Sequence, residues 1–309
     1  MVRYILQRLG YMLITLFLIA TFTFFLMKML PGTPLSADAK LSPEQREMVL
    51  EKYGLNDPVP VQYVRYMTNL VQGDLGISFQ FNNREVTDLI LDRIGPSAYL
   101  GLQSMIVGTI FGVLLGIISA MYQNSVLDYG ATIFAVIGKA VPSFVFAGLL
   151  QYFIAVKLGW LPVAFWEGFE YTILPTIALA IFPLSISARF IRTEMIEVLS
   201  SDYIVTAKAK GLSKAAVTFR HALRNALIPL ITVLGPLAVG LMTGSLVVEK
   251  IFSIPGIGEQ FVRSVATNDY PVIMGTTLFY SAFLIIVILV VDILYGVIDP
   301  RIRLSGGKK

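Results

Sequence analysis

Residues 98–122 read AYLGLQSMIVGTIFGVLLGIISAMY, a stretch without a single charged side chain. A bilayer core about 30 Å thick needs about 20 consecutive apolar residues in a helix. The stretch therefore predicts a helix that crosses a membrane. Within it Gly108, Gly112 and Gly116 repeat every four residues. Small residues at this spacing lie on one helix face and let another helix approach closely, so we expect this face to pack against a neighbouring helix.

The whole chain has the composition of a polytopic membrane protein. Of its 309 residues, 56% are hydrophobic and 14% are charged, and the mean hydropathy is +0.74. Soluble domains are about 45–50% apolar and about 25% charged. The expected fold class is therefore all-α, with six transmembrane helices. The predicted spans are Leu9–Leu30, Ala98–Tyr122, Gly130–Lys157, Ile173–Ile191, Ala226–Val248 and Met274–Ile298.

The distribution of Lys and Arg predicts the orientation of these spans. The loop 189–225 carries seven basic residues against three acids, whereas residues 31–97 carry six against nine. Cytoplasmic loops are enriched in Lys and Arg, so we expect both termini in the cytoplasm. The net charge of +4 then reflects topology, not a nucleic-acid partner. The first span is too long for a cleaved signal peptide and is expected to remain as an anchor.

These spans divide the chain into five predicted parts. The extracytoplasmic segment is expected to be helical, with a capping box at Ser42–Gln45, a helix end at Gly54, and amphipathic helices over Val61–Val71 and Glu85–Ile94. It either packs as a cap over the first two spans or contacts a partner or substrate. The predicted parts are a cytoplasmic tail 1–8, the first span 9–30, the extracytoplasmic segment 31–97, a permease core 98–305 that includes the cytoplasmic loop 192–225, and a tail 306–309.

The last extracytoplasmic loop contains a Pro255-Gly256 turn followed by a short helix that carries Phe261. It either dips toward the membrane as a cap over a pathway or forms a plain surface hairpin.

Two ionisable residues fall well inside predicted spans. Lys139 lies about nine residues into the third span, and Asp292 about six residues from the cytoplasmic end of the sixth. A lysine at the centre of a span costs roughly 2.5–3.5 kcal/mol on insertion scales, so a partner or water is expected beside it. We hypothesise that both residues face a wet pathway and interact. The alternative is that Lys139 extends alone toward the cytoplasm.

The loop between the fourth and fifth spans contains DYIVTAKAKGLSKAAVTFRHALRNALIP, residues 202–229. Asp202 is predicted to cap a short helix, and Gly211 is predicted to end it in the left-handed conformation. Ser213 is predicted to cap a second helix that runs through Phe219 into the next span. The loop is thus expected to present a folded, basic surface beside the membrane.

The sequence lacks the usual constellations of catalytic residues. It has no GxxxxGK[ST] phosphate loop and no cysteine, and His221 is its only histidine. A nucleotide site of that type and a His-based metal site are therefore excluded. Carriers coupled to protons or sodium bury several carboxylates, whereas here only Asp292 lies deep. We expect a pathway that is not an enzyme, with no catalytic residue, metal or cofactor, driven from outside the chain.

Residues 202–229 resemble the cytoplasmic EAA loop of ABC-importer permeases. The form of the loop is that of the dipeptide/oligopeptide/nickel branch, and it is most similar to the B-type permease subunit of oligopeptide importers. Other stretches agree, so that the resemblance covers nearly the whole chain. They are GLNDPVPVQYVRYMTNLVQGDLGISF (54–79), EKIFSIPGIGEQFVRSVATNDYPVIMG (249–275) and VDILYGVIDPRIR (291–303).

The resemblance implies a type I importer permease fold and a role as half of a peptide pathway in a bacterial inner or plasma membrane. It implies four kinds of partner besides membrane lipid: a homologous second permease, two cytoplasmic ATP-binding subunits, an external lipid-anchored or periplasmic peptide-binding protein, and a peptide substrate. Import of dipeptides or of nickel or metal chelates is the alternative within the branch. A stand-alone channel, a secondary carrier and a scaffold or sensor subunit are alternatives outside it.

The resemblance also assigns a docking role toward an ATPase subunit to eight residues of the loop. The family's Glu-Ala-Ala positions fall on Val205, Thr206 and Ala207. The glutamate is therefore absent, and no contact made by it is carried over. The eight residues are Asp202, Tyr203, Ala207, Lys208, Ala209, Lys210, Gly211 and Leu212.

Overall fold

The structure is a computed structural model that describes residues 2–31, 47, 50–51 and 54–298. Within these residues every regular element is a helix. Five helices are long and apolar enough to cross a membrane, and a bent pair of helices makes a sixth span if the two count as one. The predicted fold class, an all-α polytopic membrane protein, is confirmed. The predicted capping box at Ser42–Gln45 lies outside the described residues.

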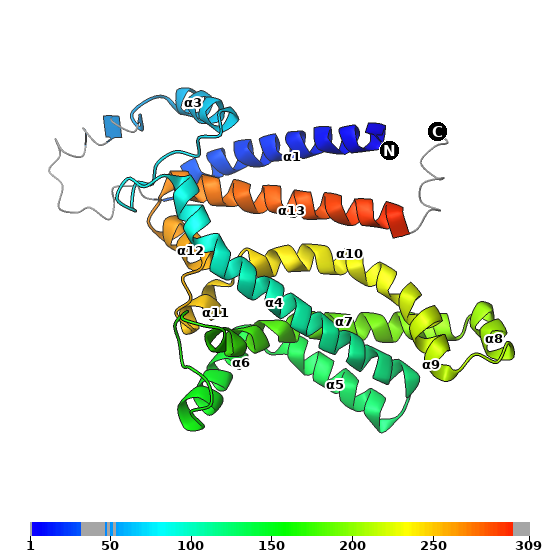
Figure 1. The fold of residues 1–309 in the computed structure, drawn as a ribbon. Coiled ribbons are helices and arrows are strands. Elements are labelled where there is room, and N and C mark those ends of the chain that lie inside the picture. Colours follow the sequence, from blue (N-terminus) through cyan, green and yellow to red (C-terminus); the bar gives the residue numbers. More distant parts are fainter. Residues whose placement is uncertain (1, 32–46, 48–49, 52–53, 299–309) are drawn as a thin grey trace. The chain divides into compact units, whose positions relative to one another are not determined.

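The chain divides into two compact units, which we describe separately. Unit 1 comprises residues 1–95 and 257–285, and unit 2 comprises residues 96–256 and 286–309. Two helices, α4 (Val86–Met121) and α13 (Tyr270–Ile298), continue from one unit into the other. The other helices of unit 1 are α1 (Val2–Lys28), α3 (Val59–Val71) and α12 (Ile257–Ala266) (Figure 1). Those of unit 2 are α5 (Val126–Ala140), α6 (Ser143–Leu150), η1 (Gln151–Lys157), α7 (Glu170–Leu199), α8 (Asp202–Ala209), α9 (Lys214–Ala216), η2 (Val217–Ala222), α10 (Leu223–Met242) and α11 (Leu246–Ile251).

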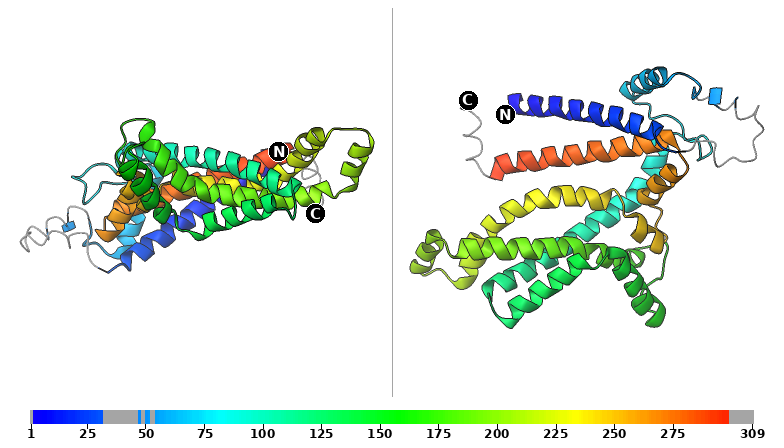
Figure 2. Two further views of the ribbon diagram at one scale, coloured as in Figure 1. Left: turned by 90° about the horizontal axis from the view of Figure 1, so that it is seen from below. Right: turned by 180° about the vertical axis from the view of Figure 1, so that it is seen from behind.

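Helix α7 is the central helix of unit 2. It packs against α5 on one side and α10 on the other, as the views in Figures 1 and 2 agree. Toward one end of α7, Leu174 is buried in a cluster with Leu100 of α4. Toward the other end, Met195 is buried in a second cluster that includes Leu230 of α10. Both clusters use α7, so this helix connects the apolar cores at the two ends of the unit.

The glycine face of α4 lies directly against the backbone of α7. A Cβ atom added at Gly108 would lie 2.4 Å from the carbonyl oxygen of Ala180. At Gly112 it would lie 2.4 Å from the carbonyl oxygen of Leu184, and Gly116 repeats the pattern one turn further on. Real side chains do not approach so closely, so only glycine permits this spacing. The predicted packing role of the three glycines is confirmed.

The third predicted span, Gly130–Lys157, consists of two helices with a bend between them. Helix α5 ends at Ala140, and α6 begins at Ser143 after a bend of 100°. Val141 between them is extended, with φ −84° and ψ 124°. The residue before a proline avoids the helical conformation because of the proline ring, and Pro142 follows Val141. The chain past the bend continues through α6 into the wider π-helical turns of η1.

By contrast, the external helix predicted over Glu85–Ile94 and the second span form one helix, α4. Pro96 lies inside it and cannot donate to the carbonyl of Asp92, four residues earlier. Asp92 is exposed, so water can donate to that carbonyl instead.

The last extracytoplasmic loop, which contains the Pro255-Gly256 turn, is folded tightly and is not a plain hairpin. Glu249 is 1% exposed, and its Oε1 accepts a hydrogen bond of 2.6 Å from the hydroxyl of Ser97. A Cβ atom added at Gly256 would lie 2.2 Å from the Cδ of Glu249. The Pro-Gly turn therefore packs directly on a buried carboxyl group.

Unit 1 has its own apolar core and a buried carboxyl group. Asp269 is fully buried; it accepts hydrogen bonds from the Ser78 hydroxyl at 2.5 Å and from the backbone N–H groups of Phe79 at 3.1 Å and Gln80 at 3.2 Å. Burial raises the pKa of Asp269 above its ordinary value, and these hydrogen bonds oppose the shift. The network fixes the segment 78–80 to the start of α13.

We expect Gly112→Ala to destabilise the protein, because the added methyl group would clash with the α7 backbone. Overpacking of this kind costs about 1–3 kcal/mol. The measurement is the temperature at which the detergent-solubilised protein stops eluting as a single species. The matched control is Gly148→Ala on α6, where an added Cβ atom meets nothing within 4 Å. Equal stability of the two variants would contradict the close approach of α4 and α7.

Candidate functional site

Helix α8 and the turn after it form the first candidate site, which we call the α8 loop (residues 202–212). The helix begins one residue earlier than predicted. Ser201 occupies the N-cap position, and Asp202 is the first residue of the helix. The predicted capping role of Asp202 is therefore wrong. A carboxylate in the first turn still faces the positive end of the helix dipole, which explains an acid at this position.

The end of α8 agrees with the prediction. Gly211 has φ +80°, and its N–H donates to the carbonyl of Lys208 at 3.0 Å. Few residues other than glycine adopt this left-handed conformation without strain. The hydroxyl of Ser213 then accepts a hydrogen bond of 3.3 Å from the N–H of Ala216, so its predicted capping role is confirmed.

A small apolar cluster holds α8 in place. Ile204, Ala207 and Val217 are buried together, with Val198 and Leu199 packed around them. One polar contact adds to this cluster: the side-chain amide of Asn225 donates to the Tyr203 hydroxyl at 2.8 Å. The α8 loop is thus attached both to the end of α7 and to the start of α10.

The eight residues predicted to dock divide into two groups. Ala207 is 6% exposed and lies in the cluster just described, so it supports the helix from within. The remaining seven are exposed: Asp202, Tyr203, Lys208, Ala209, Lys210, Gly211 and Leu212.

Two exposed apolar side chains of this region were not among the predicted docking residues. Val205 is 59% exposed and Phe219, on η2, is 57% exposed. Val205 drew notice in the sequence only because it stands where the family has glutamate.

An ion pair between a buried carboxylate and a guanidinium whose side chain is 30% exposed stands where α7 approaches the α8 loop. The Nε and Nη2 atoms of Arg192 donate to the two carboxylate oxygens of Asp128 at 2.7 and 2.8 Å. Asp128 is 1% exposed and also accepts hydrogen bonds from the hydroxyl of Ser119 and, at 2.8 Å, from the backbone N–H of Asn124. The pair joins α4, α5 and α7. Sequence reasoning missed it because the partners are 64 residues apart.

Lys139 belongs to the second candidate site. It is the penultimate residue of α5, directly before the bend, and its side chain is exposed. It borders two cavities, of about 300 Å³ and about 380 Å³. The smaller cavity is also lined by Arg189 and Glu194 of α7, and the larger one by Pro142 and Ser143 at the bend. The bend thus places Lys139 at the border of both cavities.

The predicted partner of Lys139 cannot be described in the same detail. Asp292 is part of α13, but its side chain lies outside the described residues. An interaction between Lys139 and Asp292 stays a prediction.

Family comparisons agree over both halves of the chain. Residues 112–304 match the family described as "Binding-protein-dependent transport system inner membrane component". Residues 1–100 match the N-terminal family described as "Binding-prot-dependent transport system membrane comp, N-term".

Curated relatives align over almost the full length. The dipeptide transport system permease protein DppB of Lactococcus lactis is 49% identical over 98% of this chain and 100% of its own. DppB of Bacillus subtilis is 44% identical over 98% of this chain and 99% of its own. The oligopeptide transport system permease protein OppB of Haemophilus influenzae is 43% identical over 98% of this chain and 100% of its own.

We expect Arg192→Gln to destabilise unit 2, because it leaves the Asp128 carboxylate buried without its cation. Breaking a fully buried pair costs about 3 kcal/mol or more, and the partial exposure of Arg192 makes the expected cost smaller than this. Thermal inactivation of the purified protein measures the effect. The double variant Asp128→Asn with Arg192→Gln should recover part of the loss, since it removes the unpaired charge.

The control is Arg84→Gln, which breaks the exposed pair between Arg84 and Asp92, 2.6 Å apart. Exposed pairs add little stability, so this variant should behave like the unchanged protein. If both variants lost the same stability, the Asp128–Arg192 pair would have no special structural role.

Proposed function

The chain belongs to the family of binding-protein-dependent transport system inner membrane components, and from this membership we propose that it is the permease subunit of an ATP-driven peptide importer. Family membership makes the chain a membrane transport component and not an enzyme. In the proposed role it forms half of the pathway, and a homologous second permease forms the other half. Two cytoplasmic ATP-binding subunits supply energy, and an external peptide-binding protein delivers the substrate.

The observation that carries the proposal is a full-length identity of 41–49% to permeases named for peptide transport. We propose oligopeptides as the substrate class. A specific observation favours dipeptides as a second candidate, because the relatives at 49% and 44% identity are named dipeptide permeases. Competition for uptake between dialanine and tetraalanine, in cells that carry only this importer, separates the two candidates.

The α8 loop is the proposed contact with an ATP-binding subunit, on the cytoplasmic side together with both chain termini. Its exposed apolar side chains, Tyr203, Val205 and Leu212, suit apolar pockets of a partner. The exposed cations Lys208 and Lys210 suit an acidic rim around such pockets. Because the helix is fixed to α7 and α10, a displacement of α8 would act on both of these helices.

Lys139 is the proposed pathway residue, together with Asp292. Lys139 lies beside the bend of the third span and borders two cavities. A lysine in such a position is expected to face water or substrate. Irregular helices at membrane depth are tolerated where they line a water-filled space. The bent third span is therefore the proposed wall of the pathway.

We expect Gly211→Val to lower peptide uptake by about tenfold or more, since a left-handed backbone costs a β-branched residue roughly 1–3 kcal/mol. Uptake of a labelled tripeptide by whole cells measures the effect. Ligand loading of the external binding protein should be unchanged. The matched control is Gly159→Val, which has φ +65° and equally open surroundings but lies outside the α8 loop. Equal loss of uptake in both variants would reject the coupling role.

We expect Lys139→Met to lower uptake several-fold while the subunits still assemble, because the variant removes the charge and keeps most of the side-chain volume. Lys157→Met, at the exposed end of η1, is the control for loss of a lysine. Initial rates of tripeptide uptake at equal membrane content of the complex measure the effect. Unchanged uptake in Lys139→Met would remove Lys139 from the pathway.

A further inference from the structure

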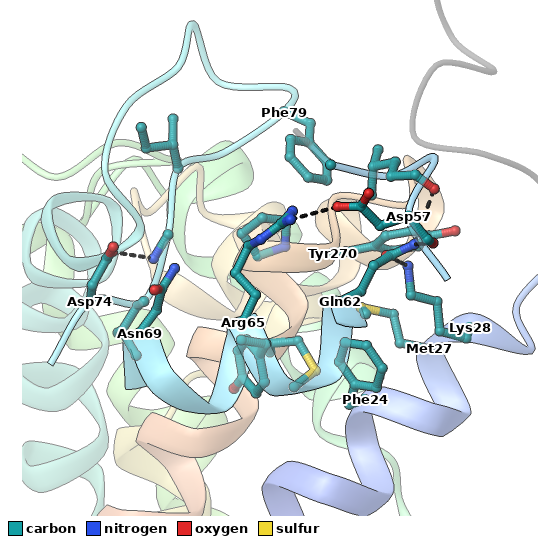
Figure 3. Close-up of a pocket in the computed structure, with 18 of the residues that line it drawn as sticks. Phe24, Met27, Lys28, Asp57, Gln62, Arg65, Asn69, Asp74, Phe79 and Tyr270 are labelled. Carbon is teal, nitrogen blue, oxygen red and sulfur yellow. Dashed lines mark hydrogen bonds and ion pairs between the residues drawn. The ribbon is translucent and has the colours of Figure 1, made fainter. Parts of the chain in front are cut away.

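Unit 1 contains a cavity of about 690 Å³, which we call the α1–α3 cavity. Ligand pockets range from about 300 to 1,000 Å³, so the space suffices for a small organic ligand. Its walls come from the end of α1, from α3, from the turn 54–57, from the segment 74–79 and from the start of α13 (Figure 3).

One wall of the cavity is apolar and aromatic. Phe24 and Met27 of α1 and Met274 of α13 are buried together in one cluster. The rings of Tyr66 and Tyr270 continue this surface. Such a wall suits apolar side chains or the aliphatic part of a ligand.

A half-buried cation stands at one end of the cavity. The Nζ atom of Lys28 donates to the Gln62 side-chain oxygen at 2.5 Å and lies 5.0 Å from the centre of the Tyr270 ring. Among the described residues, no carboxylate lies within 4.0 Å of it. An ammonium group has three donors, so Lys28 can donate further hydrogen bonds to an anion.

A carboxylate stands at the other end. In Figure 3 the Asp74 and Lys28 side chains lie on opposite sides of the lining residues, with Arg65 and Asp57 between them. Asp74 is exposed, and its Oδ1 accepts a hydrogen bond of 2.7 Å from the N–H of Gly76. Its second oxygen remains available to a cation.

The wall between the two ends is preformed, and Glu51 also lines the cavity, so that its lining holds three carboxylates and two cations. Arg65 and Asp57 form an ion pair at 2.5 Å. The Gln62 amide nitrogen donates to the carbonyls of Leu55 at 3.0 Å and Asp57 at 2.7 Å. Gly54 has φ +62°, and a Cβ atom there would lie 1.8 Å from the Nη1 of Arg65. Glycine is therefore required for Arg65 to reach this position.

The cavity also contains a polar atom without a partner. The hydroxyl oxygen of Tyr66 is buried and makes no hydrogen bond to any residue that the structure describes. Burial raises the pKa of Tyr66, so the group stays a neutral donor. A buried hydroxyl without a partner costs free energy, but this oxygen is closed off from the open space, and the ligand site does not use it.

We propose that the α1–α3 cavity binds a short peptide with free termini, whose carboxylate lies against Lys28 and whose ammonium group lies near Asp74. The inference rests on the proposed function, which makes peptides the transported class, and adds a peptide site in unit 1. Opposite charges at the two ends match a zwitterion, whereas an anion alone would be repelled by Asp74. The aromatic wall receives the side chains of the peptide.

The test is binding of tetraalanine to the purified full-length protein in phosphatidylcholine nanodiscs without the external binding protein, measured by calorimetry. We expect saturable binding that weakens about tenfold for the C-terminally amidated peptide, because a charge-assisted hydrogen bond is lost. The N-acetylated peptide should also bind more weakly. In Lys28→Gln the free and amidated peptides should bind equally. The matched control Lys250→Gln, an exposed lysine outside the cavity, should keep the preference for the free carboxylate.

Four results would overturn the proposal: no binding, equal binding of free and amidated peptides to the unchanged protein, a preference that survives in Lys28→Gln, or displacement of the peptide by a lipid. Displacement of tetraalanine by added phosphatidylethanolamine would assign the cavity to a lipid headgroup instead. The peptide derivatives are tested on the unchanged protein, so the experiment does not depend on a variant that folds poorly. Uptake by whole cells keeps the two proposals apart. If cells that carry the importer take up no peptide, the proposed function is rejected. If they take up peptide but the purified protein shows no Lys28-dependent binding, only the cavity proposal is rejected.

Discussion

The close approach of α4 to α7 is the constraint on which the rest of unit 2 depends. Between apolar helices in lipid there is little hydrophobic driving force, so association relies on close packing and internal hydrogen bonds. Three glycines of α4 let its backbone contact carbonyl groups of α7; they are Gly108, Gly112 and Gly116. Once α7 is fixed on this face, its other faces receive α5 and α10. The ion pair of Asp128 and Arg192 then joins α4, α5 and α7 at one end of the bundle.

Helix α7 connects the two candidate sites. Ser185 and Arg189 of α7 line the smaller cavity beside Lys139, and the C-terminal end of α7 leads into α8. The cluster around Ile204 keeps the short helix from turning independently. Rigid elements with shared packing are the physical means by which a displacement at one site reaches another. A permease driven through a surface loop needs this kind of connection.

Local signals in the sequence predicted local features correctly. Gly211 ends α8 and Ser213 caps the next helix, because turn and cap geometry depend on neighbouring residues. One local prediction failed, because Ser201 and not Asp202 occupies the N-cap position of α8. The bend at Pro142 has a local cause, since the residue before a proline avoids the helix, but the hydropathy that predicted the third span gives no information about its shape. Pro96, by contrast, lies inside α4 and does not end it.

By itself, the sequence determined that the chain crosses a membrane several times, that one α4 face packs closely, and that a basic helical loop lies between two spans. These features follow from hydropathy, spacing and capping, which act over a few residues. Only the tertiary structure decided that Arg192 pairs with a buried carboxylate, that Ala207 supports α8 from within, and that Lys28, Tyr66 and Asp74 surround one cavity. Such contacts join residues far apart in the chain, and their partners are set by helix packing.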